Sequence, residues 1–265
     1  MKKKTILRTL ADVVIYLVAF LFIQLFVTLI AQHFYADLAA NPTALVVTQA
    51  VSSVLTVVLF LALRWVSVSG NYIRTRPWGV LVWASLLTFG TIIPSEWLAE
   101  AMNIDAPEDY EQLMLRIMSS RWGYLLIGIL VPVAEEMVFR GAILRSLLSM
   151  FNRQSHWVAI VLSAMIFGAV HGNLAQFVHA TLLGLLLGWM YYRTESIFPG
   201  IVVHWVNNSI AYIIFLLMPG MTDARLIDLL QGDHRRELLY VAFSLMIVAP
   251  CLVQLHLRMR RAGGK

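Results

Sequence analysis

Long apolar stretches alternate with short polar segments along most of the chain. A helix that crosses a bilayer needs about 20 predominantly apolar residues, and the pattern predicts eight such helices, of which the fifth is short. Their predicted ranges are 10–32, 43–64, 78–101, 122–149, 157–171, 174–192, 199–218 and 238–257. The predicted fold class is all-α: a polytopic transmembrane helix bundle of about eight spans, forming a single membrane domain over residues 1–265.

Composition supports a protein whose surroundings are a lipid bilayer. Hydrophobic residues make up 60% of the 265 residues and charged residues 13%, against about 45–50% and about 25% in soluble domains. The one cysteine, Cys251, excludes a disulfide within the chain and a cluster of thiolate metal ligands. The net charge of +5 does not indicate a nucleic-acid partner, because the basic residues lie in short runs at the ends of the predicted spans.

The N-terminal segment MKKKTILR resembles the start of a signal peptide. The apolar run behind it is too long for that role and no small-residue cleavage site follows, so we expect an uncleaved first span. With a cytoplasmic N-terminus, eight spans return the C-terminus to the cytoplasm, and the positive-inside rule favours this orientation in a plasma (inner) membrane. The basic residues predicted to be cytoplasmic are Lys2, Lys3, Lys4, Arg8, Arg64, Arg74, Arg76, Arg145, Arg153, Arg193, Arg258, Arg260, Arg261 and Lys265, and those predicted outside are Arg116, Arg121, Arg225, Arg235 and Arg236.

The predicted fourth span contains two adjacent glutamates and an arginine in the stretch PVAEEMVFRG. Ionisable groups at bilayer depth are costly and mark functional sites by default. Glu136 and Arg140 are four residues apart, so we expect them to pair on one helix face. Neighbouring positions point about 100° apart, so Glu135 is expected to face elsewhere without a local partner, which suits a general base. Pro132 is expected to kink the helix and open space for water beside Glu135.

Two further polar clusters follow at helical spacing. FGAVHGN places Phe167 and His171 one turn apart at the end of the predicted fifth span, and HWVNNS places His204 and Asn208 on one face of the predicted seventh span. Brought together with Glu135, these groups would suit a water activated by a carboxylate or a metal ion, with Asn208 donating to an oxyanion. Each feature alone has a structural alternative: a Glu–Arg clasp, an interfacial histidine, or an asparagine that joins two helices. The three together, in this order and spacing, favour a functional site.

The order EExxxR, FxxxH and HxxxN on successive spans resembles the intramembrane proteases of the CAAX-processing and bacteriocin-processing superfamily. That group includes the Rce1-type prenyl endopeptidases and the Abi proteins. The stretch LLGLLLGWMYYRTESIFPGIVVHWVNN is also similar to the family's segment between its last two motifs. The resemblance covers residues 120–212, approximately, and the other spans match only in being membrane spans.

The resemblance implies a hydrolase, an intramembrane glutamate- or metallo-endopeptidase. In it Glu135 would activate the attacking water with the help of His171, while His204 and Asn208 would hold the tetrahedral intermediate. The supporting residues that the resemblance implies are Glu136, Arg140 and Phe167. No HExxH motif is present, and two alternatives stay open for the cofactor: a zinc ion held by Glu135, His171 and His204, or no metal ion at all.

The predicted topology places His171 near the outer end of its span and His204 near the inner end of its own. At about 1.5 Å of rise per residue their depths differ by more than one helical turn. A single site therefore requires tilted or broken spans, for which Pro199-Gly200 and Gly172-Asn173 are the expected places. His179 lies outside the motifs and is expected to make a structural hydrogen bond or to line the cavity.

Three functions are compatible with these features. The first is an endopeptidase that hydrolyses a peptide bond of a membrane-associated protein or peptide. The second is a non-catalytic immunity or scaffold protein that retains the site. The third is a proton-coupled transporter, since buried Glu, His and Arg also form proton relays, although the sequence shows no inverted repeat. The motif positions are all intact, which favours catalysis.

Overall fold

The computed structural model describes residues 5–35, 37–68, 70–151, 154–217 and 225–261. Within these ranges every regular element is helical, so the all-α prediction is confirmed. The elements in chain order are α1 (Ile6–Phe34), α2 (Pro42–Ala62), α3 (Asn71–Arg74), α4 (Trp78–Ala101), α5 (Glu108–Ser119), η1 (Leu125–Leu130), α6 (Val131–Glu135), η2 (Glu136–Leu144), α7 (Arg145–Leu148), α8 (His156–Ala169), α9 (Leu174–Thr194), α10 (Phe198–Leu217), α11 (Leu226–Leu229) and α12 (His234–Arg258). The basic residues that lie outside the described ranges are Lys2, Lys3, Lys4, Arg153 and Lys265.

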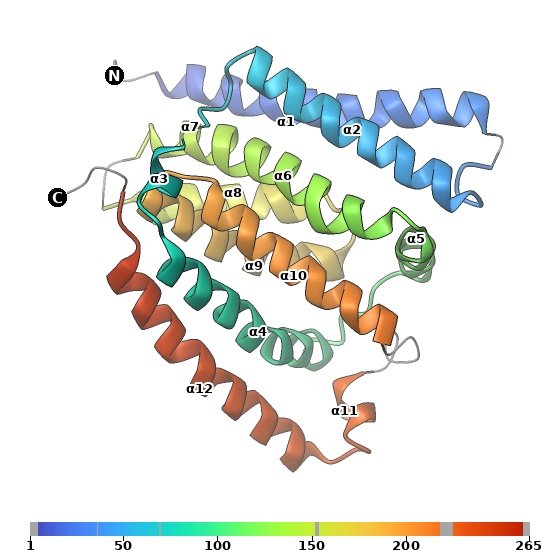
Figure 1. Cartoon of the computed structure of the whole chain (residues 1–265), viewed down its shortest axis with the longest axis vertical. Helices are drawn as coiled ribbons and strands as arrows, with labels where there is room; N and C mark the ends of the chain where they lie inside the picture. Colours follow the sequence, from blue (N-terminus) through green and yellow to red (C-terminus); the bar gives the residue numbers. More distant parts are fainter. Residues whose placement is uncertain (1–4, 36, 69, 152–153, 218–224, 262–265) are drawn as a thin grey trace.

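Among the described residues, six helices are long and apolar enough to cross a membrane by length and composition: α1, α2, α4, α9, α10 and α12. The predicted fourth span corresponds to the continuous run η1–α6–η2–α7, called the central rod below, and the predicted fifth span corresponds to the shorter apolar helix α8. The first turn of α1 and the last turn of α12 lie at the same end of the molecule (Figure 1). A chain that crosses the membrane an even number of times must have both ends on the same side. The number of long apolar helices shows a multi-pass membrane protein.

The central rod lies in the middle of the bundle. α1 and α2 pack together along one side, α4 and α12 along the other, and α8, α9 and α10 lie between them (Figure 1). Residues of η2 such as Phe139 and Ile143 are fully buried in a cluster that α1 and α8 also form. The outer faces of α1 and α12 instead expose large apolar side chains, including Phe22 and Met246. This distribution is typical of helices whose outer faces contact lipid.

The acidic segment NIDAPEDYEQ, which lies between the predicted third and fourth spans, is partly helical. α5 begins in it and crosses the bundle end almost at right angles to the spans (Figure 1). Glu108 and Asp109 in its first turn interact favourably with the helix dipole. Leu113 and Ile117, four residues apart, pack against residues of α2 and η1, and Arg116 Nη1 donates to Ala39 O at 2.7 Å. α5 thereby forms a short amphipathic helix that covers one end of the spans.

Candidate active site

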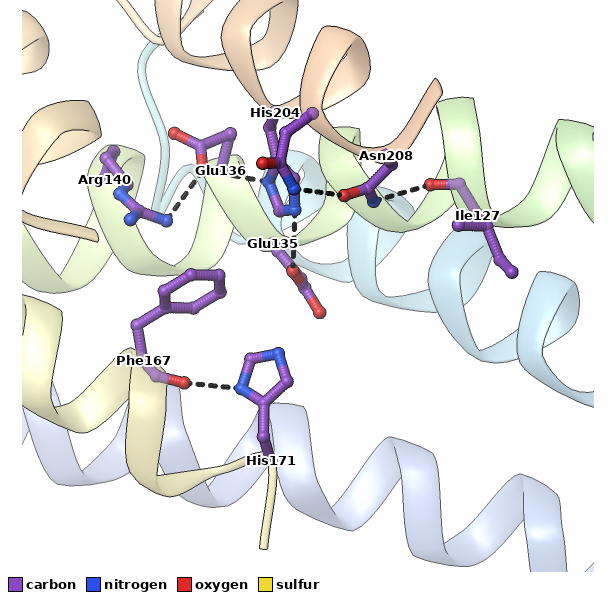
Figure 2. A network of polar contacts seen from close by, with 9 residues as sticks. Ile127, Glu135, Glu136, Arg140, Phe167, His171, His204 and Asn208 are labelled. Carbon is purple, nitrogen blue, oxygen red and sulfur yellow. Dashed lines mark hydrogen bonds and ion pairs between the residues drawn. The ribbon is translucent and has the colours of Figure 1, made fainter. Parts of the chain in front are cut away.

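The motif EExxxR lies in the central rod, whose backbone alternates between α- and π-helical hydrogen bonding. The Val131 N–H donates to Leu126 O, five residues back. In this register the next carbonyl, Ile127 O, would accept from Pro132, which has no N–H. Asn208 Nδ2 donates to this carbonyl at 2.9 Å (Figure 2). Pro132 therefore frees a backbone acceptor that anchors α10 to the rod.

Glu136 and Arg140 form the predicted ion pair in the interior of the bundle. Arg140 Nη1 donates to Glu136 Oε1 at 2.7 Å, and the two side chains are 1% and 0% exposed. The guanidinium carbon of Arg140 also lies 4.3 Å from the centroid of the Phe167 ring. The cation is thus held by a carboxylate and by an aromatic face, which compensates for its removal from water.

His204 lies between the two glutamates. Its Nε2 is 3.7 Å from Glu135 Oε2 and its Nδ1 is 3.4 Å from Glu136 Oε1 (Figure 2). The neighbour of Glu135 is therefore not local in sequence, because it comes from α10. The two carboxylates do diverge along the rod, but the imidazole from α10 lies so that each ring nitrogen faces one of them. Spacing within one helix could not show a partner that another helix supplies.

His171 reaches this cluster because α8 is short. Its 14 residues span about 21 Å at 1.5 Å per residue, less than the roughly 30 Å of the hydrocarbon core. The rings of His171 and His204 both contact the Phe167 ring, with centroid distances of 5.1 and 5.9 Å. The difference in membrane depth that was predicted between the two histidines is therefore absent. The helix that carries His171 ends at the expected position, where Gly172 has a φ of +77°.

The hydrogen bond of His171 fixes which ring nitrogen is free. Its Nδ1 lies 2.8 Å from Phe167 O (Figure 2). A carbonyl oxygen only accepts, so Nδ1 carries the proton and Nε2 of the neutral ring is an acceptor. The ring faces the Glu135 carboxylate (Figure 2). Glu135, His171, His204 and Asn208 are therefore brought to one place, with Glu136, Arg140 and Phe167 packed behind them.

Gly200 permits the close approach of α10 to the ion pair. A Cβ at this position would lie 2.5 Å from Glu136 Oε2. We expect Gly200→Ala to displace the Glu136 carboxylate, to destabilise the protein by about 1–3 kcal/mol and to lower activity. Thermal unfolding in detergent measures the first effect. Gly70→Ala is the matched control, because nothing lies within 4 Å of its Cβ, and an equal loss in both variants would contradict the packing argument.

Tyr110 of α5 is a residue that the sequence did not single out. Burial, together with the negative charge of Glu135, raises the pKa of its phenol to about 12. The hydroxyl therefore stays protonated, and able to donate, throughout the neutral pH range. Tyr110 therefore lies within electrostatic reach of Glu135, on the helix that covers one end of the bundle. The only signal in the sequence was an aromatic residue at the start of an amphipathic helix.

Removing the Tyr110 hydroxyl is expected to lower kcat/KM about tenfold. This is the loss expected if the hydroxyl donates one hydrogen bond to a charged group during the reaction. The variant Tyr110→Phe keeps the ring and its packing, so the unfolding temperature should not change. Tyr240→Phe on the exposed face of α12 is the control. Unchanged kinetics in Tyr110→Phe would place this hydroxyl outside the site.

His179 also borders the cluster. The structure gives its side chain no hydrogen bond with any described residue, which does not support the hydrogen bond expected from the sequence. The residue lies close enough to His204 and His171 to interact with them electrostatically. His179 therefore lines the same polar interior from α9, as the second expectation had it.

The zinc alternative can be tested against this geometry. Across the described part of the chain, no three His, Cys, Asp or Glu side chains are gathered closely enough to hold a metal ion. The predicted set Glu135, His171 and His204 therefore does not fit a zinc ion in this arrangement of side chains. The protein groups and a water molecule must therefore supply the chemistry in this arrangement.

Comparisons with known proteins match the segment that contains these residues. Residues 117–210 match the model of a family described as "Type II CAAX prenyl endopeptidase Rce1-like". The chain is also 29% identical over 92 residues to a Bacillus subtilis protein named "Putative membrane peptidase YdiL", a match that covers 35% of this chain and 36% of that relative. The aligned region thus spans about a third of the relative's length. No solved structure matches the chain. The matched segment contains all three motifs, and residues 117–210 of the chain are similar to the type II CAAX prenyl endopeptidase Rce1-like family.

Proposed function

We propose that the protein is an intramembrane endopeptidase that hydrolyses a peptide bond of a membrane-associated protein or peptide. The observation that carries the proposal is the meeting of three motifs from three helical segments. Glu135 from the central rod lies 3.7 Å from His204 of α10, and both lie beside Asn208 and face His171. A carboxylate, two imidazoles and an amide in one partly buried place can activate a water and stabilise the charge that develops on the carbonyl oxygen.

The proposed reaction needs one water molecule and no other reactant. Glu135 accepts a proton from the water as its oxygen attacks the scissile carbonyl carbon, and the free Nε2 of His171 orients that water. The carbonyl oxygen gains the negative charge. When the C–N bond breaks, Glu135 returns the proton to the leaving amine nitrogen. The products are a carboxylic acid and an amine, and transfer of the acid proton to the amine gives a carboxylate and an ammonium group, so atoms and charges balance.

The oxyanion would be stabilised by groups on α10. The Asn208 amide has two N–H groups, of which one is used by Ile127 O. The second remains for the developing oxyanion, together with an N–H of His204. Glu136, Arg140 and Phe167 hold His204 in place from behind.

The substrate class follows from the position of the site within apolar helices. A peptide must reach it from the bilayer or its surface, so the partners proposed are the lipid bilayer and a membrane-associated substrate. Whether a prenyl group is recognised is a separate property that the catalytic residues do not fix. The proposed location is the plasma (inner) membrane with both termini in the cytoplasm, based on the distribution of basic residues.

The activity can be tested by incubating purified wild-type protein and Glu135→Gln with a membrane extract and sequencing new termini by mass spectrometry. A prenylated CAAX peptide and its unprenylated twin are tested in parallel. New termini made by the wild type alone support the peptidase, and the ratio between the two peptides shows whether the lipid is recognised. Termini that appear equally with both proteins would reject a reaction that depends on Glu135, and an absence of new termini would favour the scaffold or the transporter.

A further inference from the structure

A second polar cavity lies at the end of the bundle where α12 ends. It has a volume of about 500 Å³ and lies between the α3–α4 junction and the last residues of α12. Four of the residues that line it are arginines, Arg76, Arg258, Arg260 and Arg261, and none is acidic. The residues of the candidate active site do not contribute to it. The cavity is therefore a separate, strongly basic feature of the molecule.

The residues that the structure describes do not neutralise most of this positive charge. Arg261 pairs with Glu195 at 2.9 Å, and Arg258 Nε donates to the neutral Gln254 side chain at 2.9 Å. Arg76 and Arg260 have no carboxylate partner in the described ranges. A cavity with several cations and no lining acid attracts an anion.

Two further features of the cavity favour an anion. Tyr72 lines it and is 4% exposed, yet its hydroxyl has no hydrogen bond to any residue that the structure describes. Burial raises the pKa of this phenol to about 12, so it remains a donor. The N-terminus of α4 opens here without a side-chain cap, and a Cβ at Gly79 would lie 3.4 Å from Arg258 Nη1. The helix dipole and a guanidinium therefore act on the same space.

The position of the cavity indicates the source of the anion. Trp78, at the first turn of α4, is 61% exposed, as is common for tryptophans at the membrane–water interface. The cavity thus lies at the depth of lipid headgroups, and basic pockets between membrane helices bind acidic headgroups. We propose that this cavity binds the phosphate group of an anionic phospholipid headgroup through Arg76, Arg260 and the Tyr72 hydroxyl. This site is independent of the proposed peptidase activity.

Native mass spectrometry of the full-length protein can measure this binding. The probes are phosphatidylglycerol, phosphatidylcholine and inorganic phosphate. The wild type should retain phosphatidylglycerol in preference to phosphatidylcholine, and Arg76→Gln with Arg260→Gln should weaken that binding about 10- to 30-fold, as expected for two basic residues near an acidic headgroup. Tyr72→Phe should weaken it severalfold.

The matched control is Arg8→Gln with Arg64→Gln, which removes two exposed arginines from the same end of the bundle. It should bind phosphatidylglycerol like the wild type. An equal loss in both double variants would mean that overall surface charge attracts the lipid, and the site would be rejected. No preference of the wild type for phosphatidylglycerol would also reject it. Inorganic phosphate that binds as tightly as the lipid would identify free phosphate as the source of the anion. The conservative variant Arg76→Lys with Arg260→Lys keeps both positive charges. It should retain most of the lipid binding if the loss in the glutamine variant comes from the missing charge and not from misfolding.

Discussion

Replacing Glu135 with glutamine is expected to lower kcat/KM for peptide cleavage by about 10²- to 10⁴-fold, the usual contribution of a general base. Glutamine keeps the size of the side chain but cannot accept the proton of the attacking water. Stability should change by less than about 1 kcal/mol, because Glu135 is 14% exposed and its contact with the His204 ring, at 3.7 Å, is longer than a hydrogen bond. Steady-state kinetics and thermal unfolding in the same detergent measure both effects.

Glu237→Gln is the matched control for this variant. Glu237 is also a buried glutamate with a histidine partner, His234 at 3.0 Å, but it lies on the outermost helix α12 (Figure 1). Its substitution should leave kcat/KM close to the wild-type value. Equal losses of kcat/KM in the two variants would mean that removing either carboxylate disturbs the fold, and the assignment of Glu135 as the general base would be rejected.

Replacing Arg140 with leucine is expected to have the largest effect on folding. Glu136 is 0% exposed and its main partner is Arg140 at 2.7 Å, so the variant leaves a buried carboxylate unpaired. Such a change destabilises a protein by about 3–5 kcal/mol. The loss of the cation over the Phe167 ring adds to it. Reduced yield of monodisperse protein and a lower unfolding temperature in detergent would show the effect.

The double variant Glu136→Leu with Arg140→Leu tests whether the ion pair only stabilises the helix or also positions the active site. It removes both charges, so most of the lost stability should return. Activity should not return, because His204 Nδ1 loses the carboxylate that it faces at 3.4 Å. A double variant that regained full activity would show that the pair only holds the helix in place.

The sequence predicted the spans well because apolar length is a local property. The eight predicted ranges coincide with helical segments whose ends differ by about four residues or less. The pairing of Glu136 with Arg140 was predictable for the same reason, since both partners lie on one helix. α5 was missed because its acidic start resembles a loop, while the apolar spacing that makes it a helix begins only at Leu113.

The parts of the site that involve several helices were not predictable. His204 approaches both glutamates only once α10 lies against the central rod, and Gly200 is what permits that approach. The anchoring of Asn208 to Ile127 O depends on the π-helical register around Pro132. The sequence suggested only a kink there, because hydrogen-bond register is set by packing and not by composition.

The most direct test of the proposed site is the cleavage of one membrane-anchored peptide in water enriched in heavy oxygen. Wild type and Glu135→Gln are compared in nanodiscs at equal amounts of folded protein, with Glu237→Gln as the control. A Glu135-activated water predicts that wild type and control release a fragment whose new carboxylate contains one heavy oxygen, while Glu135→Gln releases almost none. The same labelled fragment at the same rate from Glu135→Gln would contradict the assignment of Glu135 as the general base.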